Sequence, residues 1–272
     1  MGECAHKQVL TMRVVLIGAG RLAHNLGQAL LCAGHDIVQV FSRTRESAAA
    51  LAEKVGASSV TDVEAVINDA DIYIICVSDS ALRDVASRVC RGREHRLFVH
   101  TAGSMPVDVF KGLAERYGVL YPMQTFSKEK TADFSVIPFF IEASDEITAG
   151  EIAGLAGTVG GSVTKLSSAS RRTLHLAAVF ACNFVNHCYA LSADILASEG
   201  IPFDVMLPLI DETARKVHGM SPASAQTGPA VRYDVNVIRR QSGMLADRPL
   251  MKDIYELMSK SIHRKELDND KL

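Results

Sequence analysis

A glycine-rich turn near the start of the chain lies between a short apolar run and a stretch of helix-forming residues. The apolar run, residues 14–17, has the length and β-branched content of a buried parallel strand. It leads into Gly18-Ala19-Gly20 and then Arg21-Leu22-Ala23, where the helix-forming stretch begins. Glycine, glycine and alanine at this spacing, between a strand and a helix, match the G-x-G-x-x-A fingerprint of a dinucleotide-binding turn.

Each position of the fingerprint has a physical role. Gly18 allows the tight turn, Gly20 lets a pyrophosphate approach the backbone, and Ala23 lets the helix pack closely on the strand. The free N–H groups and the positive dipole end of the helix would bind the phosphates. The alternative is a strand–turn–helix without a ligand, which the context of the motif disfavours. The predicted phosphate-binding residues are Gly18, Gly20, Arg21, Leu22 and Ala23.

The end of the second predicted strand, residues 36–41, indicates the type of dinucleotide. An NAD site has an acidic residue here that binds the ribose 2′-hydroxyl. This chain instead has Ser42-Arg43-Thr44-Arg45, and its first acidic residue, Glu46, follows both arginines. Hydroxyls and guanidinium groups suit a 2′-phosphate, so the sequence favours NADP(H) over NAD. The alternative is a solvated loop with two ordinary surface arginines.

Polar residues follow three further strands. Residues 71–77 lead into Ser78-Asp79-Ser80, residues 96–100 lead into Thr101-Ala102, and a polar and aromatic loop occupies 121–127. The carboxyl ends of parallel strands meet at one edge of a sheet, where ligands bind. Ser78 or Asp79 could equally cap the helix predicted over 81–90, and both roles are compatible. We expect the cofactor near Val77, Ser78, Asp79, Thr101 and Ala102, and the substrate near Gln124.

Strands and helices alternate as far as residue 166, which predicts an α/β fold with a doubly wound, mainly parallel Rossmann sheet. The predicted helices include 63–68, 107–117 and 147–159. Residues 168–198 contain no Gly or Pro and no strand periodicity, so one long helix is predicted, capped by Ser167 or Ser168. The sequence thus divides into a loose extension (1–11), a dinucleotide-binding domain (12–166) and an all-helical domain for substrate binding and dimerisation (167–272).

The composition narrows the class of protein. The 272 residues carry a formal net charge of −2 and no Trp, so neither nucleic acid nor an anionic membrane is an expected partner. Six cysteines without a C-x-x-C pair, no signal-peptide core and no apolar run of about 18 residues favour a cytoplasmic protein. The nine histidines show no paired ligand spacing, so no metal site is predicted.

The predicted long helix has an unusually polar face. At about 100° per residue, Cys182 and Asn186 lie about 20° from His175, and Asn183 lies about 80° away. His175 could exchange a proton with a carbonyl or imine, because its ordinary pKa is near neutrality, while Asn183 orients the substrate. Equally, these side chains could be hydrogen-bonded polar groups inside a helix bundle or a dimer core.

A second candidate lies further along the chain, at Thr227-Gly228-Pro229 with Arg232 and Asp234. The Thr227 hydroxyl and the Gly228 backbone could contact a ligand at this turn. Arg232 could grip a carboxylate with two parallel hydrogen bonds. The alternative is a loop between two helices, with Asp234 capping the second of them.

Several motifs together resemble a known group of proteins, the Rossmann-like NADP oxidoreductases with a helical C-terminal domain of unknown function. They belong to the superfamily of 6-phosphogluconate dehydrogenase, ketopantoate reductase and pyrroline-5-carboxylate reductase, and some members are named deazaflavin-dependent. The resemblance implies an NADP(H) cofactor and a homodimer formed through the helical domain. It rests on the fingerprint and on His100-Thr101-Ala102-Gly103, Tyr121-Pro122-Met123-Gln124-Thr125-Phe126, His175-Leu176-Ala177-Ala178-Val179 with Asn183, and Thr227-Gly228-Pro229-Ala230 with Arg232 and Asp234.

The expected activity is hydride transfer between NADP(H) and a small carbonyl, imine or deazaflavin-type acceptor. In related dehydrogenases a Lys and an Asn on the long helix carry out catalysis, but this chain has no lysine between Lys165 and Lys216. That difference motivates an alternative, a non-catalytic NADP-binding sensor or interaction protein.

Overall fold

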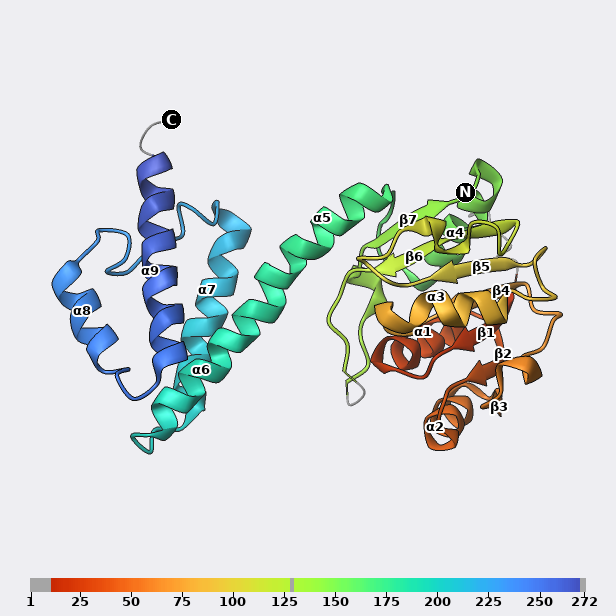
Figure 1. The fold of residues 1–272 in the computed structure, drawn as a ribbon, viewed down its shortest axis with the longest axis horizontal. Coiled ribbons are helices and arrows are strands. Elements are labelled where there is room, and N and C mark those ends of the chain that lie inside the picture. The colour runs from red at the N-terminus through yellow and green to blue at the C-terminus, as the bar shows by residue number, and fades with distance from the viewer. Residues whose placement is uncertain (1–10, 128–129, 270–272) are drawn as a thin grey trace, which may run out of the picture. The chain divides into compact units, whose positions relative to one another are not determined.

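The computed structural model describes residues 11–127 and 130–269. Its centre is one eight-stranded sheet in the order β3-β2-β1-β4-β5-β6-β7-β8, drawn in Figure 1. All neighbouring strands are parallel except β6 and β7, which are antiparallel. The strands are β1 (Arg13–Ile17), β2 (Asp36–Phe41), β3 (Ser58–Val60), β4 (Ile72–Ile75), β5 (Leu97–His100), β6 (Arg116–Pro122), β7 (Phe139–Ala143) and β8 (Val163–Lys165).

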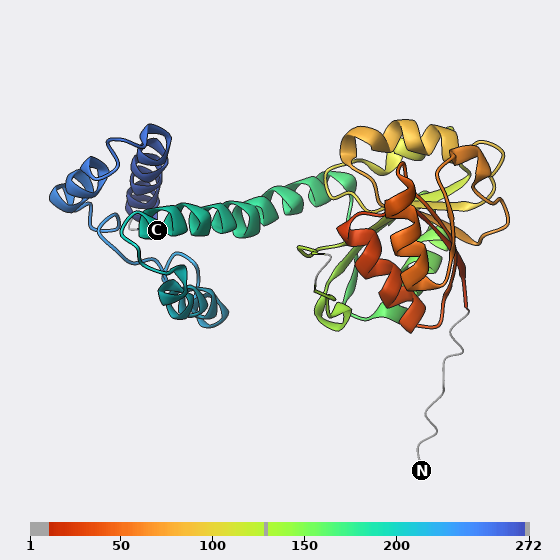
Figure 2. The same ribbon diagram turned by 90° about the horizontal axis from the view of Figure 1, so that it is seen from below.

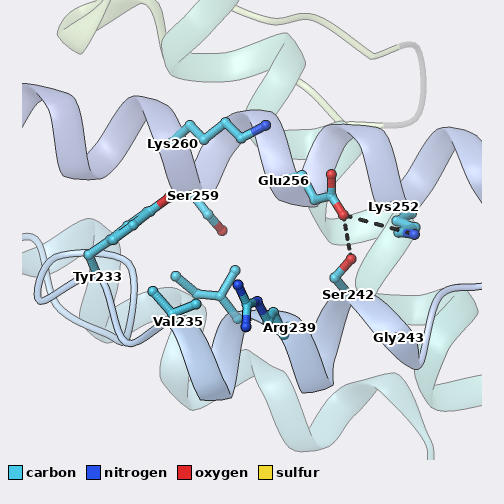
Figure 3. A pocket seen from close by; sticks show the side chains of 10 residues that line it. Tyr233, Val235, Arg239, Ser242, Gly243, Lys252, Glu256, Ser259 and Lys260 are labelled. Carbon is cyan, nitrogen blue, oxygen red and sulfur yellow. Dashed lines mark hydrogen bonds and ion pairs between the residues drawn. The ribbon is translucent and has the colours of Figure 1, made fainter.

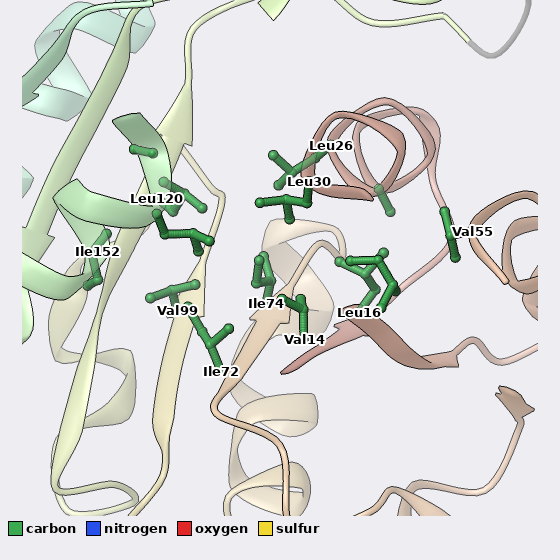
Figure 4. Close-up of a cluster of buried hydrophobic side chains, with 14 of the residues drawn as sticks. Val14, Leu16, Leu26, Leu30, Val55, Ile72, Ile74, Val99, Leu120 and Ile152 are labelled. Carbon is green, nitrogen blue, oxygen red and sulfur yellow. The ribbon is translucent and has the colours of Figure 1, made fainter. Parts of the chain in front are cut away.

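Helices cover both faces of this sheet because successive strand side chains point to opposite faces. Val14 and Leu16 of β1 join one buried cluster with side chains of α1 (Arg21–Cys32), α2 (Arg45–Val55) and α4 (Glu146–Val159), part of which Figure 4 shows. Val15 and Ile17 join a second cluster, with side chains of α3 (Asp79–Val89) and the 3-10 turn η2 (Val107–Phe110). The prediction of a doubly wound, mainly parallel Rossmann sheet is confirmed.

The strand order reverses at β1, which has β2 on one side and β4 on the other. In open α/β sheets, ligands bind at such a switch point, outside the carboxyl ends of the strands. We call the edge where β1, β2, β4, β5 and β6 end the carboxyl edge.

Two predicted helices are wrong. Residues 107–117 form only the turn η2, and the chain then enters β6, whose Arg116 pairs with Leu97 of β5. Gly112 has a left-handed backbone (φ 77°), which ends the turn early. The segment predicted as helix over 63–68 is the 3-10 turn η1 (Val63–Ala65). Strand pairing with β5 overrides local helix propensity in 107–117, and in 63–68 the burial of Val63 and Val66 does so.

The long helix forms as predicted, and its ribbon runs unbroken in Figure 2, but its geometry changes midway. Between α5 (Ser168–Ala178) and α6 (Val185–Ala197), the segment Val179–Phe184, labelled η4, is π-helical. The Ser167 hydroxyl oxygen accepts from the Ser170 N–H and caps α5. A π-helix bonds residues five apart, so a constant 100° per residue does not hold through it. The single face predicted for His175, Cys182 and Asn186 is therefore wrong.

The sequence contains no purely apolar run long enough to span a membrane, and the long helix corrects the expectation based on that. Ser168–Ala197 is long and apolar enough to cross a bilayer, judged by length and composition alone, with a mean hydropathy of 1.3 over 18 residues. An average over 18 residues tolerates the isolated His, Asn and Ser side chains that interrupt every purely apolar run in this segment.

The described residues divide into two compact units, with the boundary between Cys182 and Asn183. The first turns of the long helix thus belong with the sheet, whereas the sequence placed a domain boundary near residue 166. The second unit contains η5 (Phe203–Met206), α7 (Leu207–Gly219), α8 (Val235–Gly243) and α9 (Pro249–Asn269). Asp234 caps α8, since its carboxylate accepts from the Val237 N–H at 3.2 Å.

Candidate functional site

The turn between β1 and α1 meets the end of β4. Gly18 has φ 110°, and a Cβ placed on it would lie 2.4 Å from the Cys76 carbonyl oxygen and 3.2 Å from Cγ1 of Val77. The Gly18 N–H donates to the Phe41 carbonyl at 2.7 Å, which ties the turn to β2. Only glycine can occupy this position, because both the backbone conformation and the neighbouring strand exclude a side chain.

Gly20 shows the opposite situation. A Cβ on Gly20 would meet no atom within 4 Å, so the space beside this backbone is open. Gly20 is the N-cap of α1, and no side chain caps the helix. Ala23 is fully buried against the sheet. Uncapped N–H groups beside an open backbone suit a pyrophosphate, so this turn fits the phosphates of NADP(H). Arg21, exposed, and Leu22, half-buried, are the first residues of the helix.

Sequence reasoning missed Gly27, the residue that lets α1 lie close to β1. A Cβ on Gly27 would lie 2.8 Å from Cδ1 of Leu16. The available signal was a second small residue one helical turn after Ala23, on the same side of the helix.

The end of β2 presents two free cations. Arg43, Thr44 and Arg45 are exposed and Ser42 is half-buried. Thr44 is the N-cap of α2, but its side chain makes no capping hydrogen bond. Within residues 11–127 and 130–269, neither Arg43 nor Arg45 forms an ion pair. Unpaired guanidinium groups at this strand end fit a 2′-phosphate.

The loops after β4 and β5 are joined to each other. Ser78, at the N-cap of α3, makes no capping bond, and its Oγ lies 3.1 Å from that of Ser80. The carboxylate of Asp79 accepts from the Ser104 hydroxyl. Thr101 is buried, and its hydroxyl donates to the Ile75 carbonyl at 3.4 Å. Ser78 and Asp79 are therefore the exposed groups here, whereas the Thr101 hydroxyl bonds to the sheet.

His100 organises the loop that follows β5. It is fully buried, and its Nδ1 accepts from the Ala102 N–H at 3.2 Å. The other ring nitrogen, Nε2, therefore carries the proton and donates to the Pro106 carbonyl at 3.2 Å. Burial and, second to it, the positive charge of Arg171 lower the pKa of His100 to about 4. A neutral His100 thus holds residues 101–106, a role that the sequence alone did not assign.

Tyr121 and His175 form a hydrogen-bonded pair at the carboxyl edge. The Tyr121 hydroxyl lies 3.2 Å from Nδ1 of His175, and the two rings meet edge to face with centroids 6.2 Å apart. Burial raises the pKa of Tyr121, and the charge of Arg171 partly opposes this. A Cβ on Gly103 would lie 2.7 Å from Nδ1 of His175, so the loop after β5 packs directly on the pair. His175, predicted as a catalytic residue, is therefore hydrogen-bonded to a tyrosine to which sequence reasoning gave no role.

The remaining candidates are more dispersed. Gln124 is exposed, and its Oε1 accepts from the neighbouring Thr125 N–H at 2.9 Å. Asn183 is exposed within the π-helical segment, where the second unit begins. The loop between α7 and α8 contains Thr227, Gly228 and Arg232. The roles predicted for these five residues stay predictions.

The second unit has a pocket of about 420 Å³ between α8 and α9, shown in Figure 3. Arg239, Lys252 and Lys260 bring positive charge to it, while Glu256 accepts from the Ser242 hydroxyl at 2.5 Å. Tyr233 (φ 49°) stands at one end and stacks on His263 with ring centroids 4.3 Å apart. Among the described residues, no group of His, Cys, Asp or Glu side chains could hold a metal ion.

Known families match both parts of the chain. Residues 13–103 match the family described as NADP oxidoreductase, coenzyme F420-dependent, and residues 137–262 match a domain of unknown function, DUF2520.

Three solved structures are similar over nearly the whole chain. A Bacteroides fragilis protein provisionally named an NADP oxidoreductase is 54% identical, with 93% of this chain and 98% of that chain covered and a TM-score of 0.91. A Thermotoga maritima protein is 22% identical, covering 95% and 100%, with a TM-score of 0.70. An imine reductase from Myxococcus stipitatus in complex with NADP+ is 18% identical, covering 94% of both chains, with a TM-score of 0.66.

The Thermotoga maritima and Myxococcus stipitatus proteins are similar to this chain in fold, whereas the Bacteroides fragilis protein is similar in both fold and sequence. The resemblance stated from the motifs is confirmed, and so is the assignment of NADP(H) as the cofactor. The chain belongs to the family of NADP oxidoreductases that combine an F420-dependent-type coenzyme domain with a C-terminal DUF2520 domain.

Proposed function

We propose that the protein is an NADP(H)-dependent reductase that transfers hydride between the cofactor and a small C=N or C=O compound, with Tyr121 as the proton donor. The observation that carries the proposal is the Tyr121–His175 hydrogen bond at the carboxyl edge of the sheet. Reduction of an imine or a carbonyl needs a hydride on carbon and a proton on nitrogen or oxygen. When bound, NADPH supplies the hydride.

Tyr121 and His175 together can supply the proton that this reduction needs. Because burial raises its pKa, the Tyr121 phenol keeps its proton at neutral pH. Its O–H can then donate to the nitrogen or oxygen of an acceptor. His175 is half-buried, so it can return a proton from solvent to the phenolate through Nδ1. This arrangement requires no lysine on the long helix.

The cofactor site consists of the fingerprint turn and the loop after β2. Backbone N–H groups of Arg21 and Leu22 would hold the pyrophosphate, and Arg43 and Arg45 would hold the 2′-phosphate. The family description and the fold shared with an imine reductase support a reductase. The acceptors to test are imines, carbonyls and a deazaflavin.

Point variants test the assignment. Tyr121→Phe and His175→Gln should each lower kcat by about 10²-fold, the usual range for removing a general acid, while the Kd of NADPH changes less than twofold. Tyr117→Phe is the matched control, because Tyr117 lies on the same strand and packs on Phe110. The measurement is NADPH oxidation at 340 nm across the acceptor panel. Tight NADPH binding without turnover of any acceptor would instead support the non-catalytic sensor.

The proposal includes a homodimer in the cytoplasm. Neither α6 nor α7, two helices of the second unit, has a buried side chain, although many of their residues are apolar. A second copy of the chain is the partner that we propose for these surfaces, since apolar helices need cover on several sides.

A further inference from the structure

Arg171, in the first turn of α5, is the largest fully buried side chain among the described residues. Its Nη1 donates to Glu142 of β7 at 2.6 Å, and its Nη2 donates to the Met105 carbonyl at 2.6 Å. Its Nε is buried and has no hydrogen-bond partner within the part of the chain that the structure describes. Buried charges are normally paired because desolvation is costly, so an arginine enclosed in this way is held by a specific geometry.

The ion pair connects three elements. Glu142 also accepts from the Ser168 hydroxyl at 2.6 Å, and Ser168 in turn accepts from the Val107 N–H at 3.0 Å. These hydrogen bonds outweigh the burial that would raise the pKa of Glu142, so this pKa is lowered and the carboxylate stays charged. The start of α5 is thereby fixed to β7 and to the loop after β5.

The same contacts determine where His175 lies. His175 follows Arg171 by four residues, so the two side chains share one face of α5. Met105, which accepts from Arg171, lies in the loop whose Gly103 packs against the His175 ring. The guanidinium group thus holds both the helix that carries His175 and the loop that forms the wall beside it.

We propose that Arg171, through its buried pair with Glu142, is the positioning residue that holds His175 against Tyr121. The hydrogen bonds of Arg171 go to Glu142, Met105 and Ser168, and it acts by fixing α5 and the loop 101–106 together. The planar fork of arginine is required, because one group must bind a carboxylate and a backbone carbonyl at the same time. The expected effect of Arg171 on turnover rests on the proposed function, whereas its effect on the position of His175 does not.

Arg171→Lys and Glu142→Gln test the proposal in the full-length protein. Lysine keeps the charge but has a single compact ammonium group, and glutamine keeps the size but removes the charge. Arg116→Lys is the matched control, because Arg116 of β6 pairs with Glu151 of α4 on the same sheet and both side chains are partly exposed. Circular dichroism and thermal melting establish which variants are folded at the temperature of measurement.

The first readout does not depend on activity. With histidine labelled at Cε1 and the His175 signal assigned from His175→Gln, NMR reports the ring's contact with the edge of Tyr121. We expect the signal to move toward the position of an exposed histidine in Arg171→Lys and in Glu142→Gln, and to stay in place in Arg116→Lys. An unmoved His175 signal in both folded Arg171→Lys and Glu142→Gln would overturn the proposal, and if one variant fails to fold, the other decides.

The second readout is the split between kcat and KM. Misplacing His175 should lower kcat by at least about 10-fold, while the KM for NADPH changes less than twofold, because the fingerprint turn is untouched. A fall in kcat without movement of the His175 signal would also overturn the positioning role. If the signal moves as expected but Tyr121→Phe and His175→Gln leave kcat unchanged, the positioning role stands and the proposed function fails.

Discussion

Gly18 and Gly20 belong to one fingerprint, yet the structure gives them different reasons to be glycine. Gly18 has a left-handed backbone and no space for a side chain, whereas Gly20 has ordinary angles (φ −78°, ψ −176°) and open space beside it. The sequence motif treats both as necessary for the dinucleotide. The structure separates one residue that is needed for folding from one that is needed for the ligand.

The difference between Gly18 and Gly20 gives a direct prediction. Gly18→Ala should destabilise the protein by about 2 kcal/mol or more, because the strained angle and the contact with Cys76 add together. Gly20→Ala should leave the free energy of unfolding within about 0.5 kcal/mol of the wild type. It should nevertheless raise the Kd of NADPH by about 10-fold or more, about 1.4 kcal/mol, because the methyl group fills the approach to the phosphates. Urea unfolding and fluorescence titration measure the two effects, and an unchanged Kd in Gly20→Ala would contradict the phosphate assignment.

A second prediction at this scale concerns pH and the buried His100. Its folded-state pKa of about 4 lies below the ordinary value of 6.5, so the unfolded chain binds this proton more readily. The stability contributed by the neutral ring is complete above pH 6.5 and falls as the pH drops toward 4. The loss levels off at roughly 3–4 kcal/mol, at about 1.4 kcal/mol per unit of pKa difference.

His100→Gln isolates this contribution, because a glutamine amide can still accept from the Ala102 N–H and donate to the Pro106 carbonyl. The variant should lose less stability than the wild type between pH 7 and pH 5, measured by urea unfolding at each pH. Parallel curves for the two proteins would show that the pKa of His100 is the same in the folded and unfolded states and would contradict this prediction.

At the scale of elements, the buried strands were the most predictable part of the fold. The strand 36–41 matches β2 in both bounds, since a short segment rich in β-branched residues between two helices has few other structures available. The segment 107–117 was mispredicted because pairing with β5, which decides it, is not a local property. Likewise the π-helical segment leaves no periodic signal, so the polar face drawn through His175 was misplaced.

The candidate site was predictable to a similar degree. His175 was identified as a titratable side chain in an apolar helix, but its partner Tyr121 lies 54 residues earlier, in a different element. Nothing in the sequence distinguishes Arg171 from the other basic residues, and only the structure shows that its side chain is fully buried. Contacts between distant elements are the part of a site that a single sequence does not contain.

The loop between β2 and α2 gives a prediction about the binding of the cofactor's 2′-phosphate. Arg43→Ala should weaken NADPH binding by about 10- to 100-fold, since a hydrogen bond to a charged group contributes about 1.5–3 kcal/mol, and should change NADH binding less than twofold. Arg88→Ala is the control, because Arg88 is also an exposed arginine but lies in the last turn of α3. Calorimetric titration with both nucleotides measures the ratio, and equal losses for NADPH and NADH would reject a 2′-phosphate site at Arg43.

At the scale of the whole molecule, the apolar surface of the long helix must be covered. Leu176 and Phe180 are four residues apart on it, and they are 59% and 62% exposed. Two environments would satisfy such a surface, a second copy of the chain or a bilayer, and the length and composition of Ser168–Ala197 alone allow both. His175 favours the second copy, because its hydrogen bond to Tyr121 draws the start of this helix onto a sheet domain.

We therefore predict a homodimer that needs no detergent. Sedimentation at micromolar concentration should give twice the chain mass, and Leu176→Lys combined with Phe180→Lys should shift the protein toward monomer, because two charges would have to be desolvated at the interface. Ile147→Lys is the control, since Ile147 is 78% exposed but lies on α4 and not on the long helix. Recovery of the wild type only in the membrane fraction would assign the helix to a bilayer. A monomer in the soluble fraction would exclude both a second copy and a bilayer, and a different partner would then have to cover the apolar surface.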